Sequence, residues 1–184
     1  MFRAPLNDAG LRQAAIILLL LAAPVRQALS STAEDRFEIL ELMDRYGVVH
    51  DLGSPEEYAD LFTEDGEISA AKGPVLVKGR QALIEQARQD HERFGGPTQA
   101  DGTKTSIMRH IITDRIVRLT GAGQAQGSSY VITLINDKSE GPQILSFSRY
   151  EDTYRKIKGV WRIAHRSIII ESGNSQLGKK IGFK

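Results

Sequence analysis

The sequence predicts an α+β domain, in which a curved, cone-shaped and largely antiparallel sheet wraps around N-terminal helices and encloses a pocket. Two observations carry this prediction. Residues 31–94 hold apolar side chains mostly at helical spacing, whereas residues 106–171 hold β-rich runs joined by short turns. Because the chain shows neither an internal repeat nor a linker, we expect both halves to form one domain.

The overall composition narrows the possible functions. A chain of 184 residues can bury a substantial core, and a formal net charge of +1 gives no indication of nucleic-acid binding. Because the sequence has no cysteine, disulfides, zinc–thiolate sites and a cysteine nucleophile are excluded. The four histidines lack the H-x-x-x-H and H-E-x-x-H spacings, so we expect no metal, and no motif indicates another cofactor.

Residues 1–30 have the pattern of a signal peptide. Arg3 and Arg12 precede an apolar segment over residues 14–23, and Pro24 ends it. The apolar segment is shorter than the roughly 18 residues needed to span a membrane. We therefore predict export to the periplasm or the medium. The alternatives are an uncleaved tether, or a misplaced start codon in a cytoplasmic protein.

The sequence predicts two boundaries of the folded domain, one after the signal peptide and one before the C-terminal tail. The folded domain is expected over residues 31–172. Residues 173–184 are rich in glycine and lysine, and we expect them to form a flexible tail.

A long amphipathic helix is expected first. Ser31 and Glu34 fit a capping box, in which the N-cap hydroxyl and the glutamate satisfy each other's backbone amides. Apolar residues then recur at helical spacing over a broad stripe, and Gly53 ends the pattern. A stripe of this width predicts close packing against the rest of the domain.

Two shorter helices are expected next. Ser54-Pro55-Glu56-Glu57 has the residues that begin a helix, and its buried face would hold Tyr58, Leu61 and Phe62. Residues 63–66 are predicted to form a turn. A third helix is predicted over residues 80–94.

Six strands complete the predicted fold. Two are short, at residues 67–71 and 75–78, and four are long, at residues 106–119, 125–136, 143–156 and 160–171. The short connections between the long strands predict consecutive antiparallel neighbours. Their alternating pattern suits a sheet with one buried face.

Ionisable and polar residues gather at the end of the first predicted helix. Tyr46 and His50 are four residues apart and can face the same space, and Asp51 follows directly. A carboxylate is electrostatically unfavourable at a helix C-terminus, which indicates a functional partner. The alternatives are that Asp51 serves the following turn, that Tyr46 belongs to the core and that His50 faces solvent.

His110 is the second candidate centre. It stands on an apolar predicted strand between Met108 and Ile112. If Asp51 accepts a hydrogen bond from one ring nitrogen, the other nitrogen can act as acid or base near neutral pH. A histidine that is merely satisfied within the core is the alternative.

Tyr150 and Arg166 are candidates for binding a substrate, together with His50. Tyr150 has a position suited to a pocket, although ordinary packing within the sheet would also explain it. Arg166 could pair with Asp51, bind an anionic ligand or lie on the surface.

The chain resembles the SnoaL-like group of the nuclear-transport-factor-2-like superfamily, which includes scytalone dehydratase and ketosteroid isomerase. The resemblance runs from about Phe37 to Ile170. It is carried by Tyr46-x4-Asp51, Tyr58-Ala-Asp-Leu-Phe62-x2-Asp65-Gly66, Lys78-Gly79-Arg80, Arg109-His110-Ile111, Tyr150-x3-Tyr154, Gly159-Val-Trp161-Arg162-Ile163 and Arg166. This ordered combination is specific for the fold, but only weakly specific for an activity.

The resemblance implies an Asp–His dyad. Asp51 matches the aspartate that ends the first helix in the dehydratase-like branch, and His110 matches a histidine of the first long strand. In that branch the imidazole moves protons in a syn elimination of water. Tyr46 matches the first-helix tyrosine of ketosteroid isomerase.

Other positions depart from these relatives. The dehydratase pattern has a tyrosine where this chain has His50, a second histidine near Ile135 and an asparagine near Tyr150. The catalytic aspartate of ketosteroid isomerase falls near Ala70, so we do not predict that activity.

The resulting expectation is a cofactor-independent lyase or isomerase, dehydratase-like, that acts on a small cyclic or aromatic molecule. His110 would be the general acid/base, Asp51 would orient it, and Tyr46 would donate a hydrogen bond to the substrate. One alternative is a protein that binds a small hydrophobic ligand without turnover. Another is an assembly module, because several relatives pair through exposed sheet faces. A homodimer or homotrimer is therefore also considered.

Overall fold

The computed structural model describes residues 32–71, 73–95, 107–137 and 140–182. The chain divides into two units, residues 1–35 and 36–184, and the fold below is that of the second unit. The predicted signal peptide lies outside the described residues. Among the described helices, none is long and apolar enough to cross a membrane.

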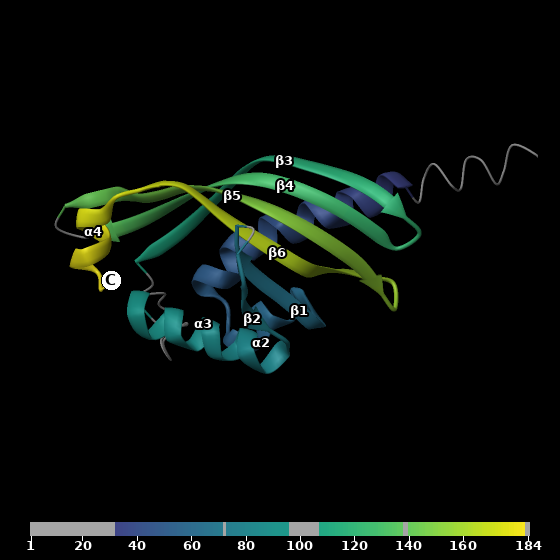
Figure 1. Cartoon of the computed structure of the whole chain (residues 1–184), viewed down its shortest axis with the longest axis horizontal. Coiled ribbons are helices and arrows are strands. Elements are labelled where there is room, and N and C mark those ends of the chain that lie inside the picture. Colours follow the sequence, from purple (N-terminus) through teal and green to yellow (C-terminus); the bar gives the residue numbers. More distant parts are fainter. Residues whose placement is uncertain (1–31, 72, 96–106, 138–139, 183–184) are drawn as a thin grey trace, which may run out of the picture. The chain divides into compact units, whose positions relative to one another are not determined.

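Six strands form one curved sheet in the order β2-β1-β6-β5-β4-β3 (Figure 1). Neighbouring strands are antiparallel except β1 and β6, which are parallel. The bounds are β1 Phe62–Ala70, β2 Val75–Lys78, β3 Met108–Gly121, β4 Gln124–Asp137, β5 Gly141–Ile157 and β6 Val160–Gly173. The predicted α+β fold with a curved, mainly antiparallel sheet is thus confirmed.

The first helix occupies residues 32–52, and the part of it within the second unit packs an apolar stripe against the sheet (Figure 1). Its buried side chains Ile39, Leu42, Met43 and Tyr46 recur at the spacing of one helix face. They share one hydrophobic core with residues of α2, α3 and five of the strands. The helix therefore approaches the sheet closely, which brings its C-terminal end near β3.

The second helix is shorter than predicted. Helix α2 (Pro55–Ala59) begins at the expected capping box between Ser54 and Glu57. It ends before Phe62, which is already the first residue of β1. The turn predicted at residues 63–66 is wrong, because these residues continue the strand. The pairing of β1 with β6 is irregular between Phe62 and Glu67, and in this stretch Glu64 and Asp65 are exposed whereas Thr63 is buried.

Helix α3 (Arg80–Phe94) confirms the third predicted helix. Gly79 precedes it with a φ of 81°, in the left-handed region that favours glycine. One face of the helix is buried, and it holds Leu83, Ile84, Ala87, His91 and Phe94. The same face also directs polar residues toward the end of the first helix, as described below.

The prediction of a flexible tail is wrong for residues 175–180. Those residues form helix α4 (Ser175–Lys180), which the Asn174 side chain caps by accepting a hydrogen bond from the Leu177 amide at 3.0 Å. Leu177 is buried and packs in a small apolar cluster with Phe94, Met108 and Ile135. This burial, which the glycine- and lysine-rich composition does not reveal, holds the segment against the sheet.

Gly47 marks a close approach of the first helix to β3. A Cβ atom on Gly47 would lie 2.8 Å from the carbonyl oxygen of His110. Alanine normally stabilises a helix by about 1 kcal/mol relative to glycine. Here we expect Gly47→Ala to lower the free energy of unfolding by about 1–3 kcal/mol, because the strand must move away.

Urea unfolding measures this effect, with Val48→Ala as the control on the exposed side of the same helix. If Gly47→Ala stabilised the protein, the close approach of the helix to β3 would be contradicted.

Candidate active site

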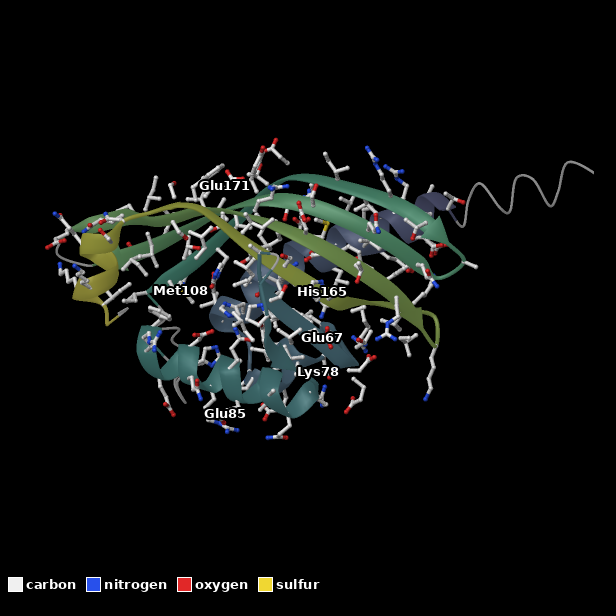
Figure 2. All side chains as sticks on the ribbon, viewed as in Figure 1. Glu67, Lys78, Glu85, Met108, His165 and Glu171 are labelled. Carbon is white, nitrogen blue, oxygen red and sulfur yellow. The ribbon has the colours of Figure 1, made fainter. Side chains whose placement is uncertain are left out.

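A cavity of about 420 Å³ lies between the sheet, α3 and the ends of the first helix and α4. Such a volume is suited to a small organic molecule. Met108 lies on its wall between the sheet and α3 (Figure 2). The apolar part of the lining consists of Phe94, Met108, Leu145, Ile168 and Ile170. Polar and ionisable side chains line the cavity where the first helix meets β3 and α3.

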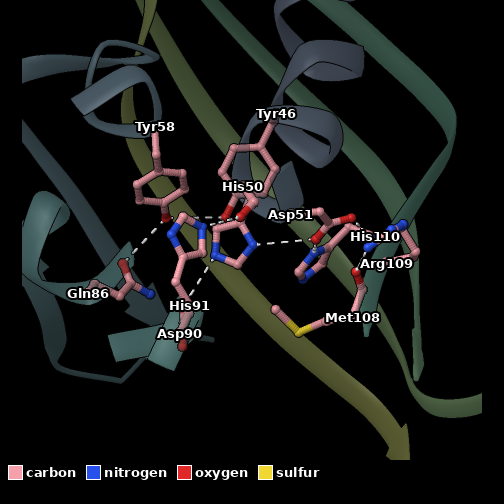
Figure 3. A network of polar contacts seen from close by, with 10 residues as sticks. All are labelled: Tyr46, His50, Asp51, Tyr58, Gln86, Asp90, His91, Met108, Arg109 and His110. Carbon is pink, nitrogen blue, oxygen red and sulfur yellow. Dashed lines mark hydrogen bonds and ion pairs between the residues drawn. The ribbon is translucent and has the colours of Figure 1, made fainter. Parts of the chain in front are cut away.

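Asp51 and His110 form a hydrogen-bonded pair beside this cavity (Figure 3). The Nδ1 atom of His110 lies 2.7 Å from Oδ1 of Asp51, and the backbone amide of His110 donates to Oδ2 at 2.8 Å. The carboxylate is 3% exposed and the ring of His110 is 9% exposed. An ionised carboxylate can only accept, so Nδ1 carries the proton and Nε2 is the basic nitrogen.

Asp51 and His110 meet because the last turn of the first helix lies against the start of β3. Asp51 stands in the last turn of the first helix, which closes where the Gly53 amide donates to the Val49 carbonyl at 2.8 Å. His110 stands near the start of β3, opposite Thr133 of β4. Since Gly47 lets the helix backbone approach His110, the next helical turn places Asp51 within reach of the ring.

His50 is buried, with an exposed fraction of 5%, so the alternative that it faces solvent is wrong. Its Nδ1 atom lies 3.7 Å from Oδ1 of Asp51, and its Nε2 atom lies 3.3 Å from Oδ2 of Asp90 (Figure 3). Its ring stacks on Tyr46 at 5.6 Å and meets His110 edge-on at 4.6 Å between centroids. It therefore joins the dyad to a second carboxylate on α3.

These contacts set the charges of the three central groups. Burial raises the pKa of Asp51, but the contacts with His110 and His50 outweigh it and hold the pKa at about 2. Burial lowers the pKa of His50, but interactions with Tyr46, Asp51 and Asp90 outweigh it and raise the pKa to about 10. The pKa of His110 is lowered, first by burial and further by the charge of His50. At neutral pH, Asp51 is therefore an anion and His110 is neutral, and the two neighbouring carboxylates favour the protonated form of His50.

Tyr46 lines the cavity, but its hydroxyl is engaged with another tyrosine. The two hydroxyls of Tyr46 and Tyr58 lie 3.3 Å apart, and Tyr58 donates to Oε1 of Gln86 at 3.3 Å (Figure 3). Because the Tyr58 proton is directed at Gln86, Tyr46 is the donor between the two phenols. A hydrogen bond from Tyr46 to a substrate would replace this contact.

Tyr150 lines the cavity, whereas Arg166 is not among the lining residues. Arg166 is fully buried and pairs with Asp152, with Nε–Oδ1 and Nη2–Oδ2 distances of 2.8 and 2.6 Å. Its guanidinium lies 3.8 Å from the ring centroid of Tyr46 and 4.1 Å from that of Tyr150. Neither a surface position nor a pair with Asp51 is found, so the prediction that Arg166 contacts the substrate is not supported by its position.

Sequence reasoning missed several polar residues of this site. Tyr58 was expected only as part of a buried helix face, and the sequence does not single out Gln86 or Asp90. His91 belongs to the buried stripe of α3, but its Nε2 atom also lies 3.2 Å from the His50 carbonyl oxygen. The available signal was spacing: Asp90 and His91 follow Leu83 and Ala87 at helical intervals, which predicts a shared direction.

His50, Asp51 and His110 also offer potential ligand atoms within 4.8 Å of one another. Both oxygens of Asp51, however, accept hydrogen bonds from His110, and Nδ1 of His110 carries the proton. A metal ion would have to displace that proton and break the pair. The geometry thus fits proton transfer better than metal binding.

The sequence and the fold are similar to those of known proteins. A family model described as the SnoaL-like domain matches residues 31–167. The function-unknown protein Rv3472 of Mycobacterium tuberculosis is 28% identical, with a TM-score of 0.64, and the match covers 80% of this chain and 78% of that one. A protein of Novosphingobium aromaticivorans, described as NTF2-like with a cystatin-like fold, is 25% identical, with a TM-score of 0.65 and coverages of 89% and 96%.

A second Novosphingobium aromaticivorans protein, provisionally named a scytalone dehydratase, is 23% identical, with a TM-score of 0.64 and coverages of 79% and 89%. At this identity the likeness shows the fold alone. A comparison with curated proteins finds no match. With the family model matching most of the chain, the protein belongs to the SnoaL-like family of the nuclear-transport-factor-2-like superfamily.

Proposed function

We propose that the protein is a cofactor-independent lyase or isomerase that removes a proton from a small cyclic or aromatic molecule, with dehydration as the most concrete reaction. The observation that carries this proposal is the hydrogen-bonded pair of Asp51 and His110 at the wall of a cavity. A cavity without the pair would have favoured simple ligand binding. A filled interior would have favoured an assembly module.

His110 is the proposed general acid/base. Its Nδ1–H donates to Asp51, which fixes the tautomer and stabilises the imidazolium that forms when Nε2 accepts a proton. In a syn elimination, the same Nε2 returns the proton to the departing hydroxyl, and the ring ends neutral. Asp51 is thus a positioning residue, and its low pKa keeps it ionised throughout.

The other residues are assigned to holding the substrate. Tyr46 is proposed to donate to a substrate oxygen in exchange for its contact with Tyr58. His50 and Tyr150 border the same part of the cavity. The apolar residues farther along the cavity would contact a ring.

Deuterium exchange tests the proposal even while the substrate is unidentified. A set of cyclic ketones that carry a β-hydroxyl group is incubated with the protein in D₂O, and the α-proton signals are followed by NMR. The proposal expects protein-dependent loss of these signals, or release of water, for some of the ketones. EDTA in a parallel sample should leave the rate unchanged.

The competing ligand-binding function gives a different outcome in the same experiment. Ketones that raise the melting temperature of the protein but exchange no proton would indicate binding without catalysis. That result across the whole set would contradict the proposed enzyme.

A further inference from the structure

We infer that the α4 end of the cavity is a recess for an apolar substituent of the substrate, such as an alkyl chain, and that Gly178 sets its depth. The inference rests on the proposed function, which places the reacting ring beside His110 and Tyr46, away from α4. It extends that function by naming the substrate class, a ring that carries an extended apolar substituent. Binding measurements alone can test the recess.

The first argument is the wall that α4 provides. Ser175 and Gly178 both line the cavity, and their i, i+3 spacing places them on one face of the helix. Leu177 is buried in the apolar cluster with Phe94 and Met108, which holds α4 in place. This wall lies beyond residue 167, where the match to the family model ends. The α4 end of the cavity is therefore built by residues that the family match does not include.

The second argument is the chemistry of the lining near α4. Phe94 and Met108 line the cavity and belong to the cluster that contains Leu177, and Leu145 lines the cavity and packs against that cluster. Ile170, near the end of β6, adds a further apolar side chain to the lining. Met108 is flexible and polarisable, so it can adapt to the shape of an alkyl chain. The side chains around α4 thus suit a substituent without polar atoms.

The third argument is the distribution of charge. No lysine or arginine is among the described residues that line the cavity, and its lining carboxylate, Asp90, contacts His50 at the other end. The side-chain oxygen of Asn174 is already used, because it accepts a hydrogen bond from the Leu177 amide. A charged substituent beside α4 would therefore lose its hydration without gaining an opposite charge. Burial of an apolar substituent there is favourable by contrast.

The fourth argument is size. The cavity has a volume of about 420 Å³, whereas an apolar cavity of roughly 150 Å³ is enough to bind benzene. A single ring beside Tyr46 and His110 would therefore leave more than half of the volume unfilled. The remaining volume can hold a substituent at least as large as the ring, and it extends toward α4.

Gly178 is assigned the depth of the recess because neither helix formation nor backbone geometry explains a glycine at this position. Glycine is less favourable in a helix than any residue except proline. Gly178 is not among the residues with a positive φ, so its backbone conformation is open to other residues. It is buried and lines the cavity. What the glycine supplies is the space that its missing side chain leaves in the wall.

The test uses a series of 4-alkylphenols whose alkyl chains lengthen from methyl to heptyl. Each compound is an uncharged ring with one apolar substituent, and isothermal titration calorimetry measures its Kd for the protein. We expect Kd to fall about fourfold for each added methylene that becomes buried. The fall should end at the chain length that fills the recess.

Gly178→Leu adds a side chain to the wall of the recess. The Kd of the longest alkylphenol that the wild type accommodates should rise by about tenfold or more, which equals the loss of roughly two buried methylenes. The Kd of 4-methylphenol should stay unchanged. Lys179→Leu is the matched control, because it adds the same side chain at an exposed position of α4.

If Gly178→Leu does not fold, Gly173→Val serves instead. Gly173 also lines the cavity, and a Cβ atom there would meet the Leu145 carbonyl oxygen at 3.7 Å, which is an ordinary contact distance. Its valine should raise the Kd of the longest alkylphenols in the same direction. Circular dichroism checks the fold of each variant.

A hydroxyl group at the end of the chain distinguishes an apolar recess from a polar one. The compound 4-(3-hydroxypropyl)phenol matches 4-butylphenol in size, and the hydroxyls of Ser146 and Ser175 would favour it if they set the character of this end. We expect it to bind about tenfold more weakly than 4-butylphenol, because its hydroxyl is buried against apolar side chains.

The inference would be overturned by equal binding of these two compounds, by a wild-type Kd that does not depend on chain length, or by no binding of the whole series. Wild-type values throughout the series in both glycine variants would also overturn it. The proposed function fails separately. The expected series in a protein that exchanges no proton would support the recess and count against the enzyme.

Discussion

Replacing His110 by glutamine should lower kcat by about 10²–10⁴-fold, with a much smaller change in KM. Glutamine can keep a hydrogen bond to Asp51 through its side-chain amide, but it cannot accept a proton from the substrate. The loss should therefore fall on the chemical step. The rate of α-proton exchange in D₂O, or of product formation once a substrate is known, measures it.

Two controls separate this effect from a loss of structure. His165→Gln makes the same chemical change on β6, away from the cavity lining, and should retain the wild-type rate. Circular dichroism and urea unfolding should show that His110→Gln is folded. A folded His110→Gln variant with wild-type kcat would contradict the assignment of His110 as general acid/base.

Replacing Arg166 by methionine should lower the free energy of unfolding by about 3–5 kcal/mol. Arg166 and Asp152 are both buried and share two hydrogen bonds, at 2.8 and 2.6 Å. Without the arginine, the Asp152 carboxylate would stay buried and would keep the hydrogen bond from the Tyr154 hydroxyl, at 2.7 Å, but lose its counter-charge. Removing one member of a buried ion pair leaves an uncompensated charge, which explains the size of the effect.

Urea unfolding of three variants tests this account. Arg149→Met removes a partly exposed arginine that pairs with Glu151 and Glu171, and it should cost at most about 1 kcal/mol. The double variant Arg166→Met/Asp152→Leu should recover part of the loss, because it removes both charges. The account would be contradicted if Arg166→Met cost no more than Arg149→Met.

The partner of Arg166 shows why strand pairing is difficult to predict from sequence. A regular hairpin between β5 and β6 pairs Ile157 with Val160, and it would place Asp152 opposite His165. The observed register shifts between Thr153 and Tyr154, which moves Asp152 opposite Arg166. A single extra residue in one strand therefore decides which side chains lie opposite each other. No residue type in this hairpin indicates where the register shifts.

The helices and long strands could be predicted because their signals are local. The capping box at Ser54 and Glu57, the helical stripe of α3 and the alternation along the long strands depend only on nearby residues. The segment at residues 63–66 was misassigned because its Asp-Gly pair also suits a bulged strand. Pairing with β6 decides between a turn and a bulged strand.

The candidate site could be predicted only in part, because it depends on contacts between elements that are distant in the sequence. The proximity of Asp51 and His110 was expected from the family resemblance, and the structure brings them to 2.7 Å. Asp90 was missed because an acidic residue on a helix usually faces water. Only the placement of α3 beside the end of the first helix shows that it faces His50.

A ¹⁵N NMR titration of His110 tests the central claim most directly, because it reports which ring nitrogen holds the proton. The account predicts that at neutral pH Nδ1 is protonated and Nε2 is not, as the bond to Asp51 requires. Because burial lowers the pKa of His110 from 6.5, Nε2 should become protonated only below that pH, and catalysis should be lost as this protonation occurs. A proton on Nε2 alone, or a charged His110 at neutral pH, would contradict the claim that this histidine is the base.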